Sequence, residues 1–372
     1  MIVVWVIVAV LFIAFMILTH ELGHYFAAKA VGIKVEQFSI GFGPEIVGWD
    51  RGETRYSIKW FLAGGSVRIL GMDPDKEVPE EDVPRSYYSA AYWKRAVVIL
   101  AGSVVHVLIA VLLFFLFFWP IGYPVLTGRV GEVQKEVEIS EEEVVEGPAY
   151  QAGLRDGDLI TAVDGVEVHD WSELSHELSS RPGEEVTLDV TRDEDSFKTE
   201  AQLLDVDGNG YVGIEVDLED TYTERSNPVK AVWQALKTTG QVTVLLVKGI
   251  GKLFSLSTLR MIVGMEPRTE EGPRSIVGAA QLTFHAAGEN LSIFIFVIAQ
   301  LFLFLAIFNL IPLPPFDGGH LLVIIIEKIS GRTIDIRKLM PLAWAVIIIL
   351  SLVALRLAVL DILNPMSNPF KP

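Results

Sequence analysis

Long apolar runs alternate with polar stretches along the chain, and four runs are long enough to cross a bilayer. A helix needs about 20 apolar residues for this. The first run begins at Ile2 and ends in a polar stretch at 19–24, and the others lie at Ala96–Trp119, Leu291–Ile311 and about Leu339–Leu363. The pattern therefore predicts a polytopic α-helical membrane protein with about four transmembrane helices.

A fifth stretch, Val229–Phe254, mixes four lysines with apolar residues. This mixture favours an amphipathic helix at the membrane interface, with its lysines toward the headgroups. A fifth span is the alternative. The first apolar run lacks the basic segment and the cleavage site of a signal peptide, so we expect it to remain as a span.

The chain changes to the two-residue alternation of β-strands after the second run. Within 129–218, Val186–Val190 and Gly210–Val216 alternate in this way. Pro148 suits the start of a helix and Asp164-Gly165 suits a tight hairpin turn. A second helix is expected at Trp171–Ser180. We therefore expect one α+β domain inserted between the apolar runs.

A smaller β-structure is expected between the first two runs. Arg55–Trp60 alternates polar and apolar residues, and together with Phe38–Phe42 and Ser66–Leu70 it predicts a small sheet. We interpret Arg55–Trp60 as its edge strand. A free edge offers hydrogen-bonding groups to an unwound peptide, so we expect a substrate to bind there as an added strand beside the candidate metal ligands.

The net charge of −17 is distributed unevenly. Residues 130–226 hold 28 acidic and 6 basic residues, and the rest of the chain holds 19 acidic and 24 basic residues. An acidic insert in a weakly basic apolar frame excludes a single soluble globule. It also argues against nucleic acid as a partner, because phosphate binding needs a basic surface. The absence of cysteine removes disulfides and thiolate metal sites.

The basic residues also predict the orientation in the membrane. The loop 31–95 carries nine Lys and Arg residues, and the loop 328–338 carries four. Basic loops stay on the cytoplasmic side. We therefore expect a multi-pass protein of the plasma membrane, with the N-terminus and the acidic insert outside.

The first run ends in HELGH at 20–24, which fits the pattern H-E-x-x-H. On a helix His20 and His24 lie one turn apart on one face, so both imidazoles can bind one metal ion. Glu21 is placed to take a proton from a metal-bound water. Chance matches to this pattern are common in soluble helices, but polar groups within an apolar span are costly and are rare unless functional.

The third run ends in an irregular segment, NLIPLPPFDGGH at 309–320. Three prolines cannot continue a helix, and such backbone is tolerated at membrane depth only when it is buried or lines a wet cavity. Asp317 is the natural third ligand, and Asn309 is a neutral donor for a substrate carbonyl or an oxyanion. The alternative is that Asp317 only caps the helix that starts near His320; His320 itself ranks below Asp317 as a ligand.

These motifs resemble the site-2 protease family of intramembrane zinc metalloproteases. The resemblance rests on LTHELGHYFAAK at 18–29 and on NLIPLPPFDGG at 309–319. FSIGFGP at 38–44 and AGGSVRILG at 63–71 are similar to the family's re-entrant β-structure beside the site. GPRSI at 272–276 and the acidic insert resemble the bacterial branch that has one extracytoplasmic PDZ-like domain and cuts anti-sigma factors or remnant signal peptides.

The resemblance implies a Zn2+ ion bound by His20, His24 and Asp317, with Glu21 as the base and Asn309 near the substrate. The basic loops place the active site, beside the small sheet, toward the cytoplasmic side. The resemblance also implies single-span membrane proteins as substrates, within the lipid bilayer.

Two positions depart from the family's usual pattern. His106 stands where relatives often have Asn, and Phe316 stands where Leu is usual. His106 either replaces an Asn hydrogen bond near the site or satisfies a backbone carbonyl.

The run GPAYQAGLRDGDLITAVDG at 147–165 looks like a PDZ domain of the bacterial protease type. PDZ domains bind an extended peptide as an added strand, so we expect a peptide or a substrate ectodomain as partner. The acidic surface has two interpretations. It either keeps the domain soluble beside the membrane or repels bulky ectodomains that have not been trimmed.

The expected organisation has four regions. They are an N-terminal membrane region at 1–119 that includes the re-entrant sheet, the PDZ-like domain at 129–218, amphipathic interfacial helices at 227–288 and a C-terminal membrane region at 289–372. The leading hypothesis is an intramembrane zinc metalloendopeptidase. A non-catalytic PDZ membrane adaptor and a metal transporter are the alternatives; the adaptor has no need of Glu21, and the transporter predicts repeat symmetry that the sequence lacks.

Overall fold

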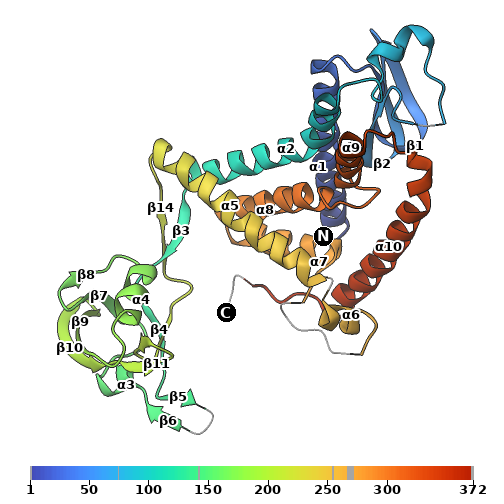
Figure 1. The fold of residues 1–372 in the computed structure, drawn as a ribbon. Helices are drawn as coiled ribbons and strands as arrows, with labels where there is room; N and C mark the ends of the chain where they lie inside the picture. Colours follow the sequence, from blue (N-terminus) through green and yellow to red (C-terminus); the bar gives the residue numbers. More distant parts are fainter. Residues whose placement is uncertain (1, 74, 141–142, 254, 266–271, 370–372) are drawn as a thin grey trace. The chain divides into compact units, whose positions relative to one another are not determined.

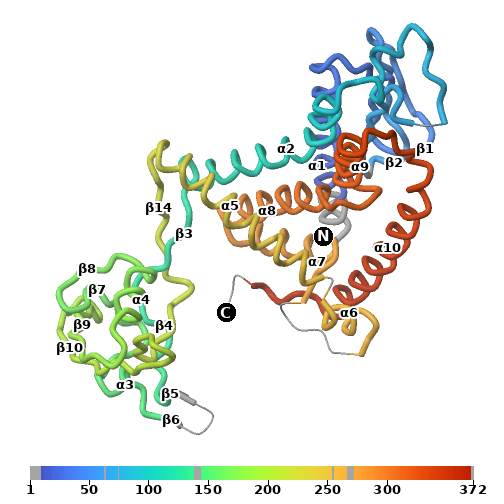
Figure 2. Tube along the Cα trace, in the orientation of Figure 1, coloured from blue at the N-terminus to red at the C-terminus, as the bar shows by residue number. Residues whose placement is uncertain are grey.

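The computed structural model describes residues 2–73, 75–140, 143–253, 255–265 and 272–369. The chain forms two compact units. The first, here called the membrane unit, comprises the described residues up to Trp119 and residues 227–369. The second, the inserted unit, is formed by Pro120–Ser226. Figures 1 and 2 trace the chain through both units.

The membrane unit is built mainly from helices (Figure 1). Four helices in the described ranges are long and apolar enough to cross a membrane, which confirms the four predicted runs. The helices of this unit are α1 (Ile2–Ala30), α2 (Tyr92–Leu116), α5 (Pro228–Leu253), α6 (Leu256–Ile262), α7 (Ile276–Glu289), α8 (Leu291–Asn309), α9 (Asp317–Ser330) and α10 (Met340–Leu363). Short 3-10 helices lie at Glu80–Arg85 and Ile336–Leu339, and a π-helical turn follows α2 at Phe117–Ile121.

Helices α1, α2, α5 and α8 share one apolar core. Phe114 of α2 and Phe302 of α8 are completely buried there, next to Met16 of α1. α5 contributes Ala235 and Val242 to the same core while its four lysines stay exposed. This two-sided character fits the predicted amphipathic helix. Together with α6, from which it is bent by 61°, α5 also fits the alternative of a broken fifth span.

Two glycines allow α1 and α2 to cross closely. A Cβ atom on Gly23 would lie 2.6 Å from the carbonyl oxygen of Ala101. A Cβ atom on Gly102 would lie 2.5–2.7 Å from the imidazole of His20. Atoms do not approach so closely without moving the backbone or the ring. The missing side chains therefore bring the polar end of α1 directly against α2.

The small sheet is a pair of long bent strands, β1 (Val35–Arg51) and β2 (Thr54–Ile69). Residues 37–40 pair with 65–68 on one side and with 55–58 on the other. Residues 55–58 pair in turn with 47–50. The prediction that Arg55–Trp60 is the edge strand is therefore wrong. Both strands fold back on themselves, and the edge beside α1 is the last part of β2, where Val67 donates to Glu21.

Helix α10 is attached to the rest of the membrane unit by polar contacts. Asp361 is completely buried and accepts hydrogen bonds from the backbone amides of Ser275 and Gly278 and from the Ser275 hydroxyl. The Arg356 guanidinium donates to the carbonyl of Ile262 at the end of α6. The GPRSI segment leads into α7, and Asp361 of α10 caps this helix start. Its carboxylate accepts from backbone amides that have no partner within the helix.

The inserted unit is a small α+β fold. Its main sheet has the strand order β10-β9-β7-β8. Its elements are β3 (Tyr123–Leu126), β4 (Val130–Val133), β5 (Glu136–Ser140), β6 (Glu143–Glu146), α3 (Pro148–Gln151), β7 (Leu159–Val163), β8 (Val166–Glu167), α4 (Trp171–Ser179), β9 (Glu185–Arg192), β10 (Asp195–Gln202), β11 (Leu204–Val206), β12 (Asn209–Tyr211), β13 (Ile214–Val216) and β14 (Thr221–Glu224).

The predicted local signals of this unit are confirmed. α3 begins at Pro148, and Gly153 follows it with a φ of +75°. Asp164 and Gly165 both have positive φ in the turn that joins β7 to β8, as a tight hairpin requires. Leu174 of α4 is completely buried in the core of the unit.

A buried ion pair ties the turn before β7 to β9. Asp158 is completely buried, and the Arg192 guanidinium donates to both of its carboxylate oxygens at 2.7 and 2.8 Å. The backbone amide of Arg155 donates to the same carboxylate. Burial alone would raise the pKa of Asp158, but these hydrogen bonds outweigh it and hold the pKa below the ordinary value of a carboxyl.

This ion pair predicts how the stability of the inserted unit depends on pH. Because the pKa of Asp158 is lowered in the folded state, its stabilisation is complete above the ordinary carboxyl pKa of about 4 and is lost as the pH falls through the folded value. Asp158→Asn should cost about 2 kcal/mol at pH 7 and should remove this acid sensitivity.

The measurement is hydrogen exchange of the β9 amides in the full chain, corrected for the intrinsic pH dependence of exchange. Asp195→Asn is the matched control, because Asp195 is exposed on the neighbouring strand. Equal protection in both variants at pH 7 would contradict a stabilising role for the pair.

Candidate metal centre

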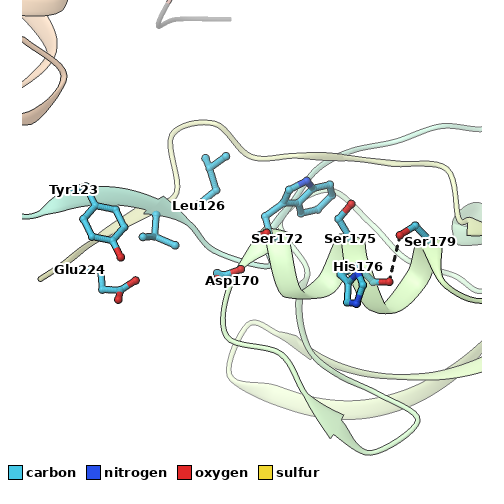
Figure 3. A pocket seen from close by; sticks show the side chains of 10 residues that line it. Tyr123, Leu126, Asp170, Ser172, Ser175, His176, Ser179 and Glu224 are labelled. Carbon is cyan, nitrogen blue, oxygen red and sulfur yellow. Dashed lines mark hydrogen bonds between the residues drawn. The ribbon is translucent and has the colours of Figure 1, made fainter. Parts of the chain in front are cut away.

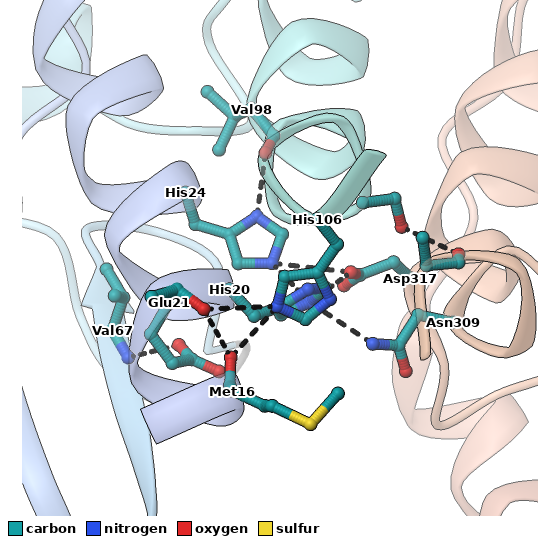
Figure 4. A network of polar contacts seen from close by, with 12 residues as sticks. Met16, His20, Glu21, His24, Val67, Val98, His106, Asn309 and Asp317 are labelled. Atoms are coloured by element: carbon teal, nitrogen blue, oxygen red, sulfur yellow. Dashed lines mark hydrogen bonds and ion pairs between the residues drawn. The ribbon is translucent and has the colours of Figure 1, made fainter. Parts of the chain in front are cut away.

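Three polar side chains from two distant parts of the chain converge inside the membrane unit (Figure 4). His20 and His24 lie one turn apart on α1, as predicted, and are 7% and 8% exposed. Asp317 Oδ2 lies 2.9 Å from His20 Nε2 and 3.3 Å from His24 Nε2, and the two Nε2 atoms are 3.1 Å apart. The residues that sequence reasoning selected as ligands therefore meet at one point.

The irregular segment after α8 is what carries Asp317 to this point. α8 ends at Asn309 and α9 begins at Asp317. A Cβ atom on Gly318 would lie 2.2 Å from the carbonyl oxygen of Leu310, and one on Gly319 would lie 2.6 Å from the nitrogen of Pro314. Both glycines are therefore required for the start of α9 to pack against the preceding turn. Asp317 is the first residue of α9, but its carboxylate points to the histidines.

These three side chains fit a zinc ion. Two imidazoles and one carboxylate are common zinc ligands, and a catalytic site keeps a fourth position for water. Bonds of about 2.0–2.1 Å in a tetrahedron separate the ligand atoms by roughly 3.3 Å, close to the separations found here. The other ring nitrogen of His24 also has a hydrogen-bond partner, since Nδ1 lies 2.7 Å from the carbonyl oxygen of Val98. Such a bond orients a ligating imidazole.

Glu21 and Asn309 lie beside the three candidate ligands. Glu21 Oε2 accepts a hydrogen bond of 3.0 Å from the backbone amide of Val67 in β2. β2 approaches this closely because Gly65 has no side chain; a Cβ atom there would lie 3.3 Å from Glu21 Cγ. The amide nitrogen of Asn309 lies 3.4 Å from His20 Nε2. The residues predicted as base and as neutral donor therefore both lie next to the histidine helix end and its candidate ligands.

The two histidines whose roles the sequence left open lie differently. His106 is completely buried on α2, and its Nε2 lies 2.9 Å from the carbonyl oxygen of Met16. His106 therefore makes the backbone-carbonyl contact that one of the two interpretations expects. His320 lies on α9 and, among the described residues, is not one of the three whose ligand atoms come together.

Sequence reasoning missed an ion pair that fixes α9. The Arg95 guanidinium on α2 lies 2.7 Å from the carboxylate of Glu327 on α9, and both residues are almost completely buried. The rings of Tyr87 and Tyr88 lie 4.9 and 5.0 Å from the guanidinium carbon. The available signal was Glu327 itself, an acid that directly follows the apolar run 321–326.

Comparison with known proteins identifies the family of the chain. Residues 8–354 match the family described as Peptidase family M50. The chain belongs to this family. It is 30% identical over 380 residues to the zinc metalloprotease Rip1 of Mycobacterium tuberculosis, covering 93% of this chain and 94% of that protein. It is also 30% identical over 387 residues to Rip1 of Mycolicibacterium smegmatis, covering 94% of each.

The chain is thus a zinc metalloendopeptidase of family M50, which is the site-2 protease family, as the resemblance implied. Its four candidate spans fit a multi-pass membrane protein.

A solved structure also matches part of the chain. It is the PDZ domain of the SdrC-like protein of Listeria monocytogenes, 22% identical, covering 26% of this chain and 90% of that one with a TM-score of 0.20. At this TM-score the match carries no argument. The expected PDZ-like character of the insert therefore rests on its own sequence and topology.

The contact between Gly102 and His20 gives a direct prediction for zinc binding. Gly102→Ala places a methyl group where the His20 imidazole lies, so zinc affinity should fall roughly tenfold or more. The measurement is competition with a chromophoric chelator on the purified full chain. Gly240→Ala is the matched control, because a Cβ atom there meets nothing within 4 Å. Unchanged affinity in Gly102→Ala would mean that α1 and α2 separate at little cost.

Proposed function

We propose that this protein is an intramembrane zinc endopeptidase that cuts transmembrane segments of single-span membrane proteins. One observation carries the proposal: His20, His24 and Asp317 meet with Glu21 and Asn309 within the helical membrane unit, beside a sheet edge. A metal site built only for structure has no use for an acid held next to its ligands. Anti-sigma factors and remnant signal peptides are the substrate classes that we favour.

The proposed chemistry assigns a role to each side chain. His20, His24 and Asp317 would hold the zinc ion, which when bound lowers the pKa of a water molecule and so supplies hydroxide near neutral pH. Glu21 takes the proton of the attacking water and returns it to the leaving amine. Asn309 donates its amide N–H to the carbonyl oxygen as negative charge develops there.

The edge of β2 at residues 65–69 is the proposed binding surface for the unwound substrate. A transmembrane helix bonds its own backbone, so its peptide bonds become accessible only after it unwinds. The freed amides and carbonyls then need new partners, and a sheet edge offers them. This edge lies beside Glu21, since Val67 donates to that carboxylate.

The inserted unit has a groove that suits an extended peptide. Its volume is about 640 Å³, and it lies between β3 and α4 (Figure 3). The helix lines it with hydroxyl groups and His176, and the strand lines it with Val125 and Leu126. We propose that this groove takes a peptide or the trimmed ectodomain of a substrate, in the manner of a PDZ domain.

We also propose an orientation in the plasma membrane. The loops 31–95 and 328–338 carry the basic residues that favour the cytoplasmic side. The sheet of β1 and β2 would then lie toward the cytoplasm with the metal centre, and the inserted unit would lie outside.

The role of Glu21 separates the protease from the other two hypotheses. Glu21→Gln should keep zinc and lose cleavage of a tagged single-span substrate by at least about 100-fold, because only proton transfer is removed. Asp317→Asn should lose zinc as well as cleavage. Zinc content is measured on the purified protein and cleavage in membranes that contain both proteins.

A zinc-replete Glu21→Gln variant that still cuts would refute the assignment of the base. Metal uptake by vesicles that contain the wild-type protein, without cleavage, would favour the transporter. Peptide binding without cleavage would favour the adaptor.

The absence of cysteine makes the proposed edge directly testable by cross-linking. In the Glu21→Gln background, Arg68→Cys should form a disulfide with a substrate that carries one cysteine in its transmembrane segment. Val47→Cys lies on the opposite edge of the same sheet and is also exposed, so it is the matched control. Equal cross-linking of both variants would contradict binding at the edge beside Glu21.

A further inference from the structure

Two buried ring nitrogens beside the metal centre have no hydrogen-bond partner. They are Nδ1 of His20 and Nδ1 of His106, and both atoms are shielded from solvent. The two rings are neighbours, with centroids 5.0 Å apart and planes inclined by 51° (Figure 4). A buried polar atom without a partner costs roughly 1–3 kcal/mol, so two of them side by side call for an explanation.

The hydrogen bonds of His106 determine which of its nitrogens carries the proton. Its Nε2 lies 2.9 Å from the carbonyl oxygen of Met16, which can only accept. It also lies 3.3 Å from the Thr19 hydroxyl, whose own hydrogen goes to that same carbonyl at 2.8 Å. Both neighbours therefore require a donor, so Nε2 is the protonated nitrogen. In the neutral ring, Nδ1 of His106 is then an acceptor.

In His20 the proton lies on the other ring nitrogen, Nδ1. Its Nε2 faces His24 and Asp317, which makes it the metal-binding nitrogen. An imidazole that binds metal through Nε2 carries its proton on Nδ1. His20 thus presents an unpaired donor, and the neighbouring His106 ring presents an unpaired acceptor.

The surroundings of His106 suit a supporting role. Gly102, one turn earlier on α2, has no side chain and lets the His20 imidazole lie against the helix. Phe302 closes the other side of the His106 ring with an edge-to-face contact at 5.2 Å. α2 therefore contacts the His20 ring at Gly102, which has no side chain, and presents a polar group to it at His106.

We infer that His106 is a positioning residue for the metal centre: its Nδ1 accepts the Nδ1 proton of His20 through one buried water. The bond fixes the tautomer and the ring orientation of His20, as the Val98 carbonyl does for His24. A water in this place would have both histidines as partners. The inference rests on the proposed zinc site and goes beyond it, because it concerns a residue that does not touch the ion.

The experiment compares three substitutions of His106 by zinc affinity. Asn places an amide oxygen near the position of Nδ1, Gln places its amide near the position of Nε2, and Leu offers neither. His106→Asn should bind zinc like the wild type, whereas His106→Gln and His106→Leu should bind it roughly 10- to 100-fold more weakly. Affinity is measured by chelator competition on the purified full chain, and cleavage by each variant should recover at saturating zinc.

Two results would overturn the inference. His106→Leu with wild-type affinity would mean that His106 only fills space, and His106→Gln tighter than His106→Asn would mean that the bond to Met16 is what matters. If His106→Leu does not fold, the comparison of Asn with Gln still decides. Failure of the zinc site itself is seen separately, because the wild type would then bind zinc no better than His24→Ala.

Discussion

The membrane unit depends on the close crossing of α1 and α2. Without side chains at Gly23 and Gly102 the helix backbones come together, and the imidazoles of α1 lie directly against α2. A polar cluster inside apolar helices is costly unless its members satisfy one another. Here several of its contacts are made across helices: His24 bonds to the carbonyl of Val98, and Asp317 contacts both histidines. The close crossing of α1 and α2 thus allows a cluster of polar side chains to lie between apolar helices.

Much of this arrangement was predictable from sequence. The spans follow from length and apolar content, and the ligands follow from helical spacing together with the rarity of polar groups in such runs. Asp317 was predictable because its segment cannot continue a helix. The turn at Asp164 and the helix at Pro148 were predictable because the chemistry of a single residue type sets the backbone there.

The parts that sequence did not reveal depend on long-range pairing. Arg55–Trp60 looks like an edge strand by its alternation, but alternation does not say how often a strand is paired. Because β1 and β2 both bend, residues 55–58 lie between two partners and the free edge moves to the end of β2. The ion pair of Arg95 and Glu327 joins residues far apart in the chain, and no local pattern couples them.

Helix α2 contributes no candidate ligand, yet it sets the position of all three. Its Val98 carbonyl orients His24, its Gly102 seats His20, and its Arg95 holds the far end of the helix that begins with Asp317. The helix acts as a template against which two separate pieces of chain are aligned. The positions of the candidate ligands therefore depend on residues of α2 that would not contact the ion. Substitutions of these residues would alter the metal site although every candidate ligand stays in place.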